Sequence, residues 1–379
     1  MKAFIFSVVL LSVVVASDRN PPERATGAVS WAGYETGVII GGFSPQELKS
    51  FTPLEPIDTH THVRRSDPGF DAMLDRLNVH VLDIILVDDR NPEENDLRVE
   101  RDAALNFIRG SGGHAVLCTS FDPFKMALPG FAETAIRGLN DDFGQGAIAV
   151  KIWKNIGMEI KDARGSYVLP DDPAFGPIYK DIAARNKTLI AHVADPDSAW
   201  APPNPASPDY SYFQKNPAWF MYGKPHPASK RQILQARDHI LEQNPSLRVV
   251  GAHLGSMEAD LHQLAQHFDR YPNFAVDLAA RMPYLALQPH ADMIAFILKY
   301  QDRLIYATDL GFSPRDNASA AINSWERTYA RDWRFLATND AVEFGEVKGQ
   351  GLALPDPVLR KIYHDNAVQW FPGILKGGH

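Results

Sequence analysis

Two histidines that lie one residue apart, His60 and His62, follow the first short apolar run of the chain. Chance pairing of 13 histidines among 379 residues gives roughly 0.4 pairs with this spacing, so the pair alone is weak evidence for a metal site. Side chains two residues apart on a β-strand point to the same face, so both imidazoles could face one ion. The pair gains meaning only if other ligand-type residues lie where one fold would bring them beside it.

Three further ligand-type side chains lie at or near the ends of later apolar runs. His192 lies in "KTLIAHV", His253 in "VVGAHLG" and Asp309 at the end of "LIYATD". Imidazole and carboxylate together suit Zn²⁺ and neighbouring divalent metals, with three or four protein ligands and one position for water. A metal-bound hydroxide would then be available near neutral pH. Asp309 could bind the metal weakly while taking a proton from that water.

The runs that carry these residues recur along the chain and are separated by segments with helical spacing. Eight short apolar runs occur, at residues 56–60, 79–88, 114–122, 147–153, 187–193, 247–254, 273–279 and 303–309. Strands that alternate with helices pair in parallel through right-handed crossovers. The pattern predicts an α/β fold, a (β/α)₈ TIM barrel whose chemistry lies at the carboxyl ends of the strands. A doubly wound open sheet is the alternative, but no Gly-rich phosphate loop follows the first run.

Two connections are too long for ordinary loops. Residues 194–228 follow the fifth run, and residues 310–356 follow the eighth. Long connections of this kind are functional lids or disordered spacers. The tryptophans and tyrosines of the first connection favour a packed lid over the strand ends.

The amino-terminal residues 1–16 have a lysine, a short apolar run and small residues at the end, which is typical of a secretory signal peptide. An uncleaved anchor or a buried segment is the alternative. We expect a mature protein that begins near Ser17 and is exported, either periplasmic or secreted, with no membrane span. Residues 17–50 would form an extension, and residues 51–379 one barrel domain.

Composition limits the partners of the protein. Hydrophobic residues make up 45% and charged residues 22%, which is ordinary for a soluble globular protein. The formal net charge is −8 without a sustained Lys/Arg cluster, which argues against a nucleic-acid partner. Cys118 is the only cysteine, so no disulfide within the chain is possible. A small-molecule substrate is the expected partner, and a homo-oligomer remains open.

Five segments together resemble a known family: "DTHTH", "IAHVADP", "VVGAHLG", "YATDLGF" and "KIYHDNAVQWF". In this order they resemble the amidohydrolase superfamily, in particular its amidohydrolase-related branch, in which metal-dependent hydrolases and decarboxylases occur together. The resemblance covers residues 53–372. It implies that His60, His62, His192 and Asp309 ligate a metal, and that His253 orients the water or polarises the substrate.

Two cationic residues have more than one possible role. Binuclear relatives carry a carboxylated lysine late in the fourth strand, and Lys151 lies in about that place, so the resemblance allows one metal ion or two. Lys151 could instead be a neutral amine ligand, or a cation that binds a substrate carboxylate. Arg281 follows the seventh run; its guanidinium could anchor an acidic substrate or pair with Asp277 or a neighbour. Lys154 is expected in a solvated loop.

These observations lead to three hypotheses. The first is a metal-dependent hydrolase that acts on an amide, ester or lactone of a small organic molecule. The second is a metal-dependent, non-oxidative decarboxylase of an unsaturated or aromatic acid. The third is a metal- or solute-binding protein without catalysis, which is disfavoured because a proton-transfer candidate, Asp309, accompanies the ligands.

Overall fold

A computed structural model describes residues 42–88 and 96–375. The expected signal peptide, and most of the expected extension, lie outside the described residues. Of that extension, residues 45–50 belong to helix α1 (Pro45–Phe51), which begins with a capping box formed by Ser44 and Glu47. Glu47 also pairs with Arg334 at 2.5 Å, so this helix is attached to the domain.

Nine parallel strands form one curved sheet in the order β8-β7-β6-β5-β4-β3-β2-β1-β9. Each apolar run singled out in the sequence overlaps a strand; β1 extends beyond its run, and the strands in the other runs are shorter than those runs. The strands are β1 (Ile57–Val63), β2 (His80–Ile84), β3 (Ala115–Ser120), β4 (Ala149–Ile152), β5 (Thr188–Ala191), β6 (Arg248–Gly251), β7 (Phe274–Asp277), β8 (Leu304–Ile305) and β9 (Leu310–Phe312).

The eighth barrel strand is interrupted, and its two parts together close the barrel. Its first part, β8, pairs with β7, and its second part, β9, pairs with β1. Between them, Thr59 donates its backbone N–H to Tyr306 O at 3.1 Å, and Asp309 donates its own to His60 O at 2.8 Å. The predicted TIM barrel is therefore confirmed, and Asp309 lies where its last strand joins the first.

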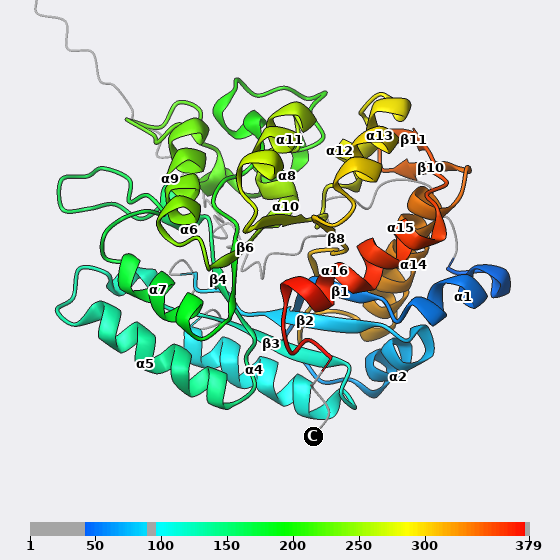
Figure 1. The fold of residues 1–379 in the computed structure, drawn as a ribbon, viewed down its shortest axis with the longest axis horizontal. Coiled ribbons are helices and arrows are strands. Elements are labelled where there is room, and N and C mark those ends of the chain that lie inside the picture. The colour runs from blue at the N-terminus through cyan, green and yellow to red at the C-terminus, as the bar shows by residue number, and fades with distance from the viewer. Residues whose placement is uncertain (1–41, 89–95, 376–379) are drawn as a thin grey trace, which may run out of the picture.

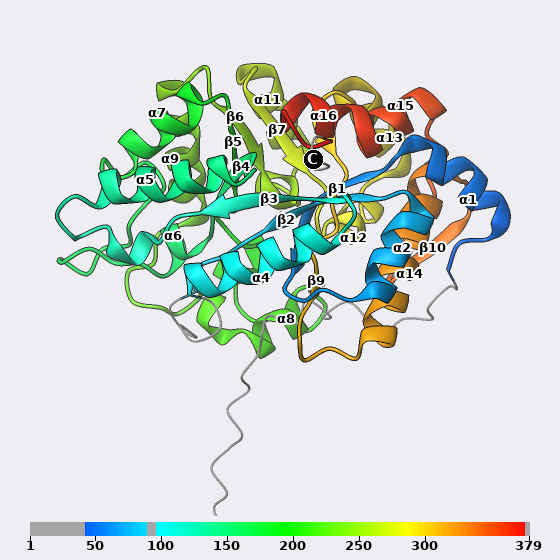
Figure 2. The same cartoon turned by 90° about the horizontal axis from the view of Figure 1, so that it is seen from below.

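Helices cover the outside of the sheet and link successive strands (Figures 1 and 2). The sequence of α2 shows why such a segment forms a helix. Asp67 caps its first turn, and its buried residues recur at helical spacing: Phe70, Met73, Leu74 and Leu77. The helices between strands are α2 (Pro68–Leu77), α4 (Leu97–Gly110), α5 (Phe131–Gly144), α6 (Asn155–Met158), α7 (Gly176–Ala184), α8 (Tyr210–Lys215), α9 (Lys230–Gln243), α10 (Ala252–Gly255), α11 (Leu261–Arg270), α12 (Met282–Ala286) and α13 (His290–Tyr300). Short 3₁₀ turns lie at Thr52–Leu54, Pro123–Lys125, Asp197–Trp200 and Pro217–Trp219.

The connection after the eighth strand contains more regular structure than its sequence suggested. It holds the 20-residue helix α14 (Ala318–Ala337) and an antiparallel hairpin of β10 (Ala341–Phe344) and β11 (Val347–Gln350). α15 (Asp356–Arg360), a π-helical turn (Lys361–Asp365) and α16 (Asn366–Trp370) follow. In α14 the buried Trp325, Tyr329, Trp333 and Leu336 form one apolar face that packs on the barrel.

The carboxyl-terminal segment closes the amino ends of the strands. Side chains from all eight barrel strands, among them the buried Cys118, form one core cluster with Trp370 and Phe371. Thr188, at the start of β5, donates its hydroxyl to Trp370 O, and Asn366 donates to Leu304 O at the start of β8. One end of the barrel is thus filled by apolar packing, which leaves the carboxyl ends of the strands for chemistry.

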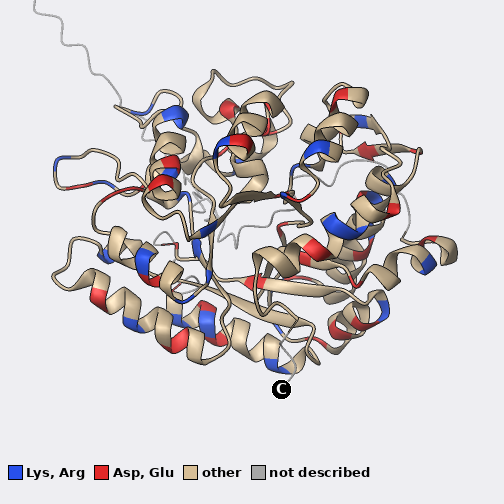
Figure 3. Cartoon of the chain, in the orientation of Figure 1, with Lys and Arg blue, Asp and Glu red and all other residues tan. Residues whose placement is uncertain are grey.

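Acidic and basic side chains are interspersed over the helices (Figure 3), and no helix of the described residues is long and apolar enough to cross a bilayer.

Candidate metal centre

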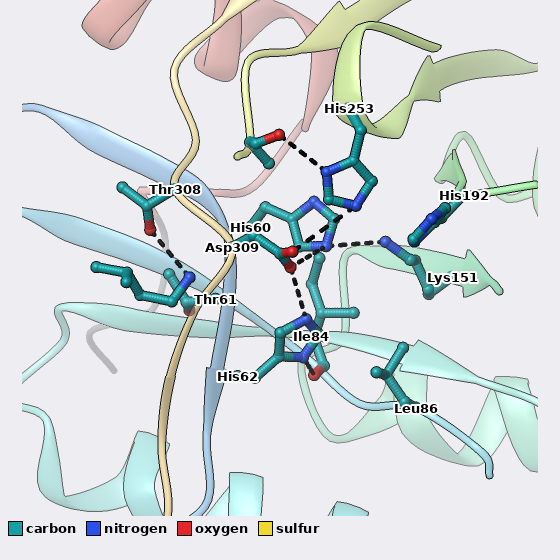
Figure 4. Close-up of polar contacts among 12 residues, drawn as sticks. His60, Thr61, His62, Ile84, Leu86, Lys151, His192, His253, Thr308 and Asp309 are labelled. Carbon is teal, nitrogen blue, oxygen red and sulfur yellow. Dashed lines mark hydrogen bonds and ion pairs between the residues drawn. The ribbon is translucent and has the colours of Figure 1, made fainter. Parts of the chain in front are cut away.

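β1 and the interrupted eighth strand bring three ligand-type side chains together. The ligand atoms of His60, His62 and Asp309 all lie within 4.8 Å of one another. Asp309 Oδ1 lies 3.3 Å from His60 Nε2 and 3.2 Å from His62 Nε2. Exposure is 1% for His60, 9% for His62 and 2% for Asp309, so the three groups share a buried corner of the barrel mouth (Figure 4).

Three imidazoles at the site are held in the same way. His60 Nδ1 lies 2.8 Å from a carboxylate oxygen of Asp277, His62 Nδ1 lies 2.8 Å from Ile84 O, and His253 Nδ1 lies 2.9 Å from Ala279 O. Carboxylate and carbonyl oxygens only accept, so each Nδ1 donates, and Nε2 is the nitrogen of each ring that could bind a metal ion. Metal-ligating histidines commonly use their second nitrogen in this manner.

Several polar atoms at the site are buried and have no hydrogen-bond partner among the described residues. They are His192 Nε2, His253 Nε2 and Asp309 Oδ2. Burial lowers the pKa of His192 and His253 well below 6.5, and neighbouring positive charges lower each further, so both imidazoles are neutral. Neutral imidazole nitrogens and a carboxylate oxygen that converge in a buried site fit a divalent cation.

Not all of the expected ligands lie in the group formed by His60, His62 and Asp309. His192 follows β5, its ring centroid is 4.3 Å from that of His253, and its Nε2 lies 3.5 Å from Asp195 Oδ1. It is outside the set of three whose atoms lie within 4.8 Å. His253 Nε2 lies 3.9 Å from Asp309 Oδ2, beyond hydrogen-bond distance. The metal-binding role of His192 therefore stays a prediction.

Lys151 enters the same site from β4. Its Nζ lies 2.9 Å from His60 Nε2, and its side chain is 1% exposed (Figure 4). Burial lowers the pKa of Lys151 to about 8, although the nearby Asp277 and Asp309 act in the opposite direction. The amine is thus cationic at pH 7 and becomes neutral in a mildly alkaline range, which leaves each of its three expected roles chemically possible.

The backbone at the strand ends is turned sharply to present these side chains. Several non-glycine residues near the strand ends have positive φ, among them His253 at 58°, Leu254 at 56° and Asp309 at 69°. Such conformations cost L-residues about 1–2 kcal/mol each, so surrounding contacts must hold them. One such contact is Asp58, which accepts hydrogen bonds from the backbone N–H and the hydroxyl of Thr308, at 3.0 and 2.6 Å.

Two cations near the site bind protein carboxylates. The Nε atom of Arg281 lies 3.7 Å from Glu258 Oε2, and its Nη1 donates to Ala280 O. Glu258 also pairs with Lys230 at 2.9 Å. Arg281 is 5% exposed.

The expectation of a solvated Lys154 is wrong. Its side chain is 0% exposed, and its Nζ donates to both oxygens of Asp195, at 2.6 and 2.7 Å, and to the hydroxyl of Tyr212 at 2.6 Å. The ammonium also lies 4.6 Å from the ring centroid of Trp219. These partners come from residues 194–228, so Lys154 fastens that connection to the end of β4, and the segment is packed as the lid hypothesis expected.

The sequence reasoning gave Asp277 no role beside the metal. A signal was present, because Asp277 lies near the end of its apolar run, as Asp309 lies at the end of the next one. From the sequence, Asp277 is expected only as a partner for Arg281, four residues away, whereas in the fold it contacts His60, 217 residues away.

The Amidohydrolase family model matches residues 85–373, which include Lys151, His192, His253 and Asp309. No curated protein matches the chain.

Among solved structures, a Staphylococcus aureus protein provisionally named an amidohydrolase is 13% identical, covers 83% of this chain and 99% of its own, and has a TM-score of 0.50. A dihydroxybenzoic acid decarboxylase from Polaromonas, with bound manganese and the inhibitor 2-nitroresorcinol, is 13% identical over 84% of this chain and 97% of its own, with a TM-score of 0.49. A 5-carboxyvanillate decarboxylase from Sphingomonas paucimobilis is 15% identical over 84% and 99%, with a TM-score of 0.45. The structural likeness concerns the fold; the family model spans more than half of the sequence, and the chain belongs to the amidohydrolase family.

Proposed function

We propose that the protein is a metal-dependent hydrolase that acts on an amide, ester or lactone bond of a small organic molecule. His60, His62 and Asp309 would hold a divalent ion, with His192 and Lys151 as further candidate ligands. Zn²⁺ suits this donor set, and Mn²⁺ is an alternative. When bound, such an ion supplies Lewis acidity, which lowers the pKa of a water molecule and polarises a carbonyl group.

One observation favours hydrolysis as the reaction. His253 Nε2 and Asp309 Oδ2 are both buried acceptors without a hydrogen-bond partner among the described residues, and they lie 3.9 Å apart. A water molecule has two O–H donors, so these atoms can hold and orient it between them. Asp309 Oδ2 would take a proton from the water as the water oxygen bonds to the carbonyl carbon. It would then deliver this proton to the amine or alcohol that leaves when the C–N or C–O bond breaks.

The geometry also separates the two roles expected for His253. Its Nδ1 proton is held by Ala279 O, so neutral His253 has no N–H left to donate towards a substrate carbonyl. Its Nε2 can accept a hydrogen bond from water. This supports the water-orienting role over the polarising one.

A decarboxylase is the second candidate, and a separate observation favours it. Burial is the main cause that lowers the pKa of His192. The nearby charges of Lys154, Lys151 and Arg281 lower it further. Cations around a metal site suit a substrate that carries a carboxylate. Lys154 and Arg281 each face a protein carboxylate, however, so Lys151 would be the main anchor. In this reaction the C–C bond to the carboxylate would break with loss of CO₂, and Asp309 would carry a proton from water to the carbon left behind.

One screen distinguishes the two reactions. The full chain, loaded with Zn²⁺ or Mn²⁺, is incubated with lactones, esters, amides and aromatic or unsaturated acids, and both acid release and CO₂ release are recorded. We expect acid release from at least one lactone, ester or amide, and its loss in His62→Ala but not in His262→Ala, a histidine on the exposed side of α11. CO₂ release without acid release would establish the decarboxylase instead.

A further inference from the structure

Asp277 joins three parts of the site through one carboxylate. It is the last residue of β7 and is 1% exposed. Its Oδ2 lies 2.8 Å from His60 Nδ1, on β1. Its Oδ1 accepts the backbone N–H of His253 at 2.7 Å and that of Ala279 at 3.2 Å. A carboxylate has only acceptor oxygens, so it can satisfy all three groups when His60 carries its proton on Nδ1.

The other nitrogen of His60 faces Lys151. Lys151 Nζ lies 2.9 Å from His60 Nε2, and an ammonium group only donates. If Lys151 is protonated, Nε2 accepts this hydrogen bond, which agrees with a proton on Nδ1. Nε2 is also the atom that faces Asp309 Oδ1, at 3.3 Å.

We propose that Asp277 is a positioning residue that holds His60 in the Nδ1-protonated tautomer and so presents Nε2 to the metal. Its second oxygen fixes the backbone of His253, which has a φ of 58°, so one side chain aligns a metal ligand with the residue that orients water. The inference rests on the proposed metal-dependent function. It adds a residue that acts through His60 and His253 and does not touch the metal.

Asparagine at this position should act as a tautomer switch. It has the shape of aspartate but only one acceptor oxygen and an NH₂ group that donates. Two backbone N–H groups face Oδ1, so the asparagine oxygen is best placed there, and its NH₂ then faces His60 Nδ1. His60 must accept at Nδ1 and carry its proton on Nε2, where the proton blocks the metal. Alanine removes the acceptor but imposes neither tautomer.

The test measures the Kd of Zn²⁺ by competition with a chelating dye for wild-type protein, Asp277→Ala and Asp277→Asn, without any assay of activity. We expect affinity to fall in that order, with Asp277→Asn at least about 10- to 100-fold weaker than wild type, as for other partners of metal-bound histidines. If Asp277 only fills space, the order of the variants reverses, because asparagine preserves the packing that alanine loses. Asp277→Asn that binds as tightly as Asp277→Ala, or more tightly, would overturn the proposal.

A second measurement needs no Asp277 variant to fold. Metal-free wild-type protein is labelled with ¹⁵N-histidine, and the His60 signals are identified by their loss in His60→Gln. We expect a protonated Nδ1 and an unprotonated Nε2, and the reverse would contradict the inference. Wild-type protein that binds no Zn²⁺ would refute the proposed function, whereas this tautomer measurement would still decide the role of Asp277.

Discussion

At the scale of single residues, contacts with protein oxygens orient the imidazoles of the site. His60, His62 and His253 each have Nδ1 held by an oxygen of the protein, so their rings are oriented without help from a ligand. Burial lowers the pKa of His60 well below 6.5, and the charge of Lys151 lowers it further. Metal binding then need not displace a proton from this imidazole near neutral pH.

Replacing the histidines by alanine one at a time should therefore reduce bound metal without unfolding the barrel. We expect the Kd for Zn²⁺ to rise more than about 100-fold in His60→Ala and His62→Ala, since even indirect partners are worth about 10- to 100-fold. The rise should be smaller in His192→Ala, whose Nε2 lies outside the tight cluster. Metal content measured by mass spectrometry, with His262→Ala as control, checks this. Full metal occupancy in all three variants would contradict the assignment of the metal site.

At the scale of elements, several strand ends could be predicted from the sequence because a polar residue lies at or near the end of an apolar run. His192, His253 and Asp309 could be placed at the barrel mouth in this way. Contacts between segments that are far apart in the sequence could not be predicted. Lys154 is buried only because Asp195, Tyr212 and Trp219 surround it, and these residues belong to another connection. A lysine in a loop is usually solvated, so its local sequence gave the wrong prediction.

The same ion pair gives a prediction for the connection of residues 194–228. Lys154→Met leaves Asp195 as a buried carboxylate that has lost its strongest partner, and breaking such a pair costs about 3–5 kcal/mol. We expect the free energy of unfolding in urea to fall by about this amount, and limited proteolysis to begin within residues 200–209. The matched control is Lys215→Met, at an exposed position of the same connection, which should stay within about 0.5 kcal/mol of wild type. Equal behaviour of the two variants would show that Lys154 does not fasten the segment.

At the scale of the whole molecule, the barrel separates stability from chemistry. Its amino end is filled by apolar side chains of the strands together with Trp370 and Phe371, whereas its carboxyl end holds the neutral imidazoles and carboxylates. The region near the amino end also carries a histidine pair, His80 and His114, whose ring centroids lie 5.0 Å apart. Burial lowers the pKa of His80, and the charge of His114 lowers it further.

This pair predicts how stability depends on pH. The folded pKa of His80 lies below its unfolded value of about 6.5, so the unfolded state binds more protons and stability is lost as pH falls through that range. Glu55 acts in the opposite direction, and His364 adds to the effect of His114. We expect His80→Gln to lose less free energy of unfolding between pH 7 and pH 5 than wild type does. Urea titrations at the two pH values measure the difference, and equal losses would contradict the assignment.

The central claim is that Asp309 both helps to hold the metal and moves the proton of the attacking water. Asp309→Asn keeps the size of the side chain and one oxygen for the ion but loses the base. General acid–base catalysis of this kind is worth about 10²- to 10⁴-fold in rate.

The decisive measurement is kcat of Asp309→Asn, on a substrate identified by the screen, across a titration with Zn²⁺. We predict weaker metal binding, and at saturating metal a kcat that remains about 10²- to 10⁴-fold below wild type while KM changes far less. Recovery of the full wild-type rate at saturating metal would contradict the account, because Asp309 would then be a ligand without a role in proton transfer.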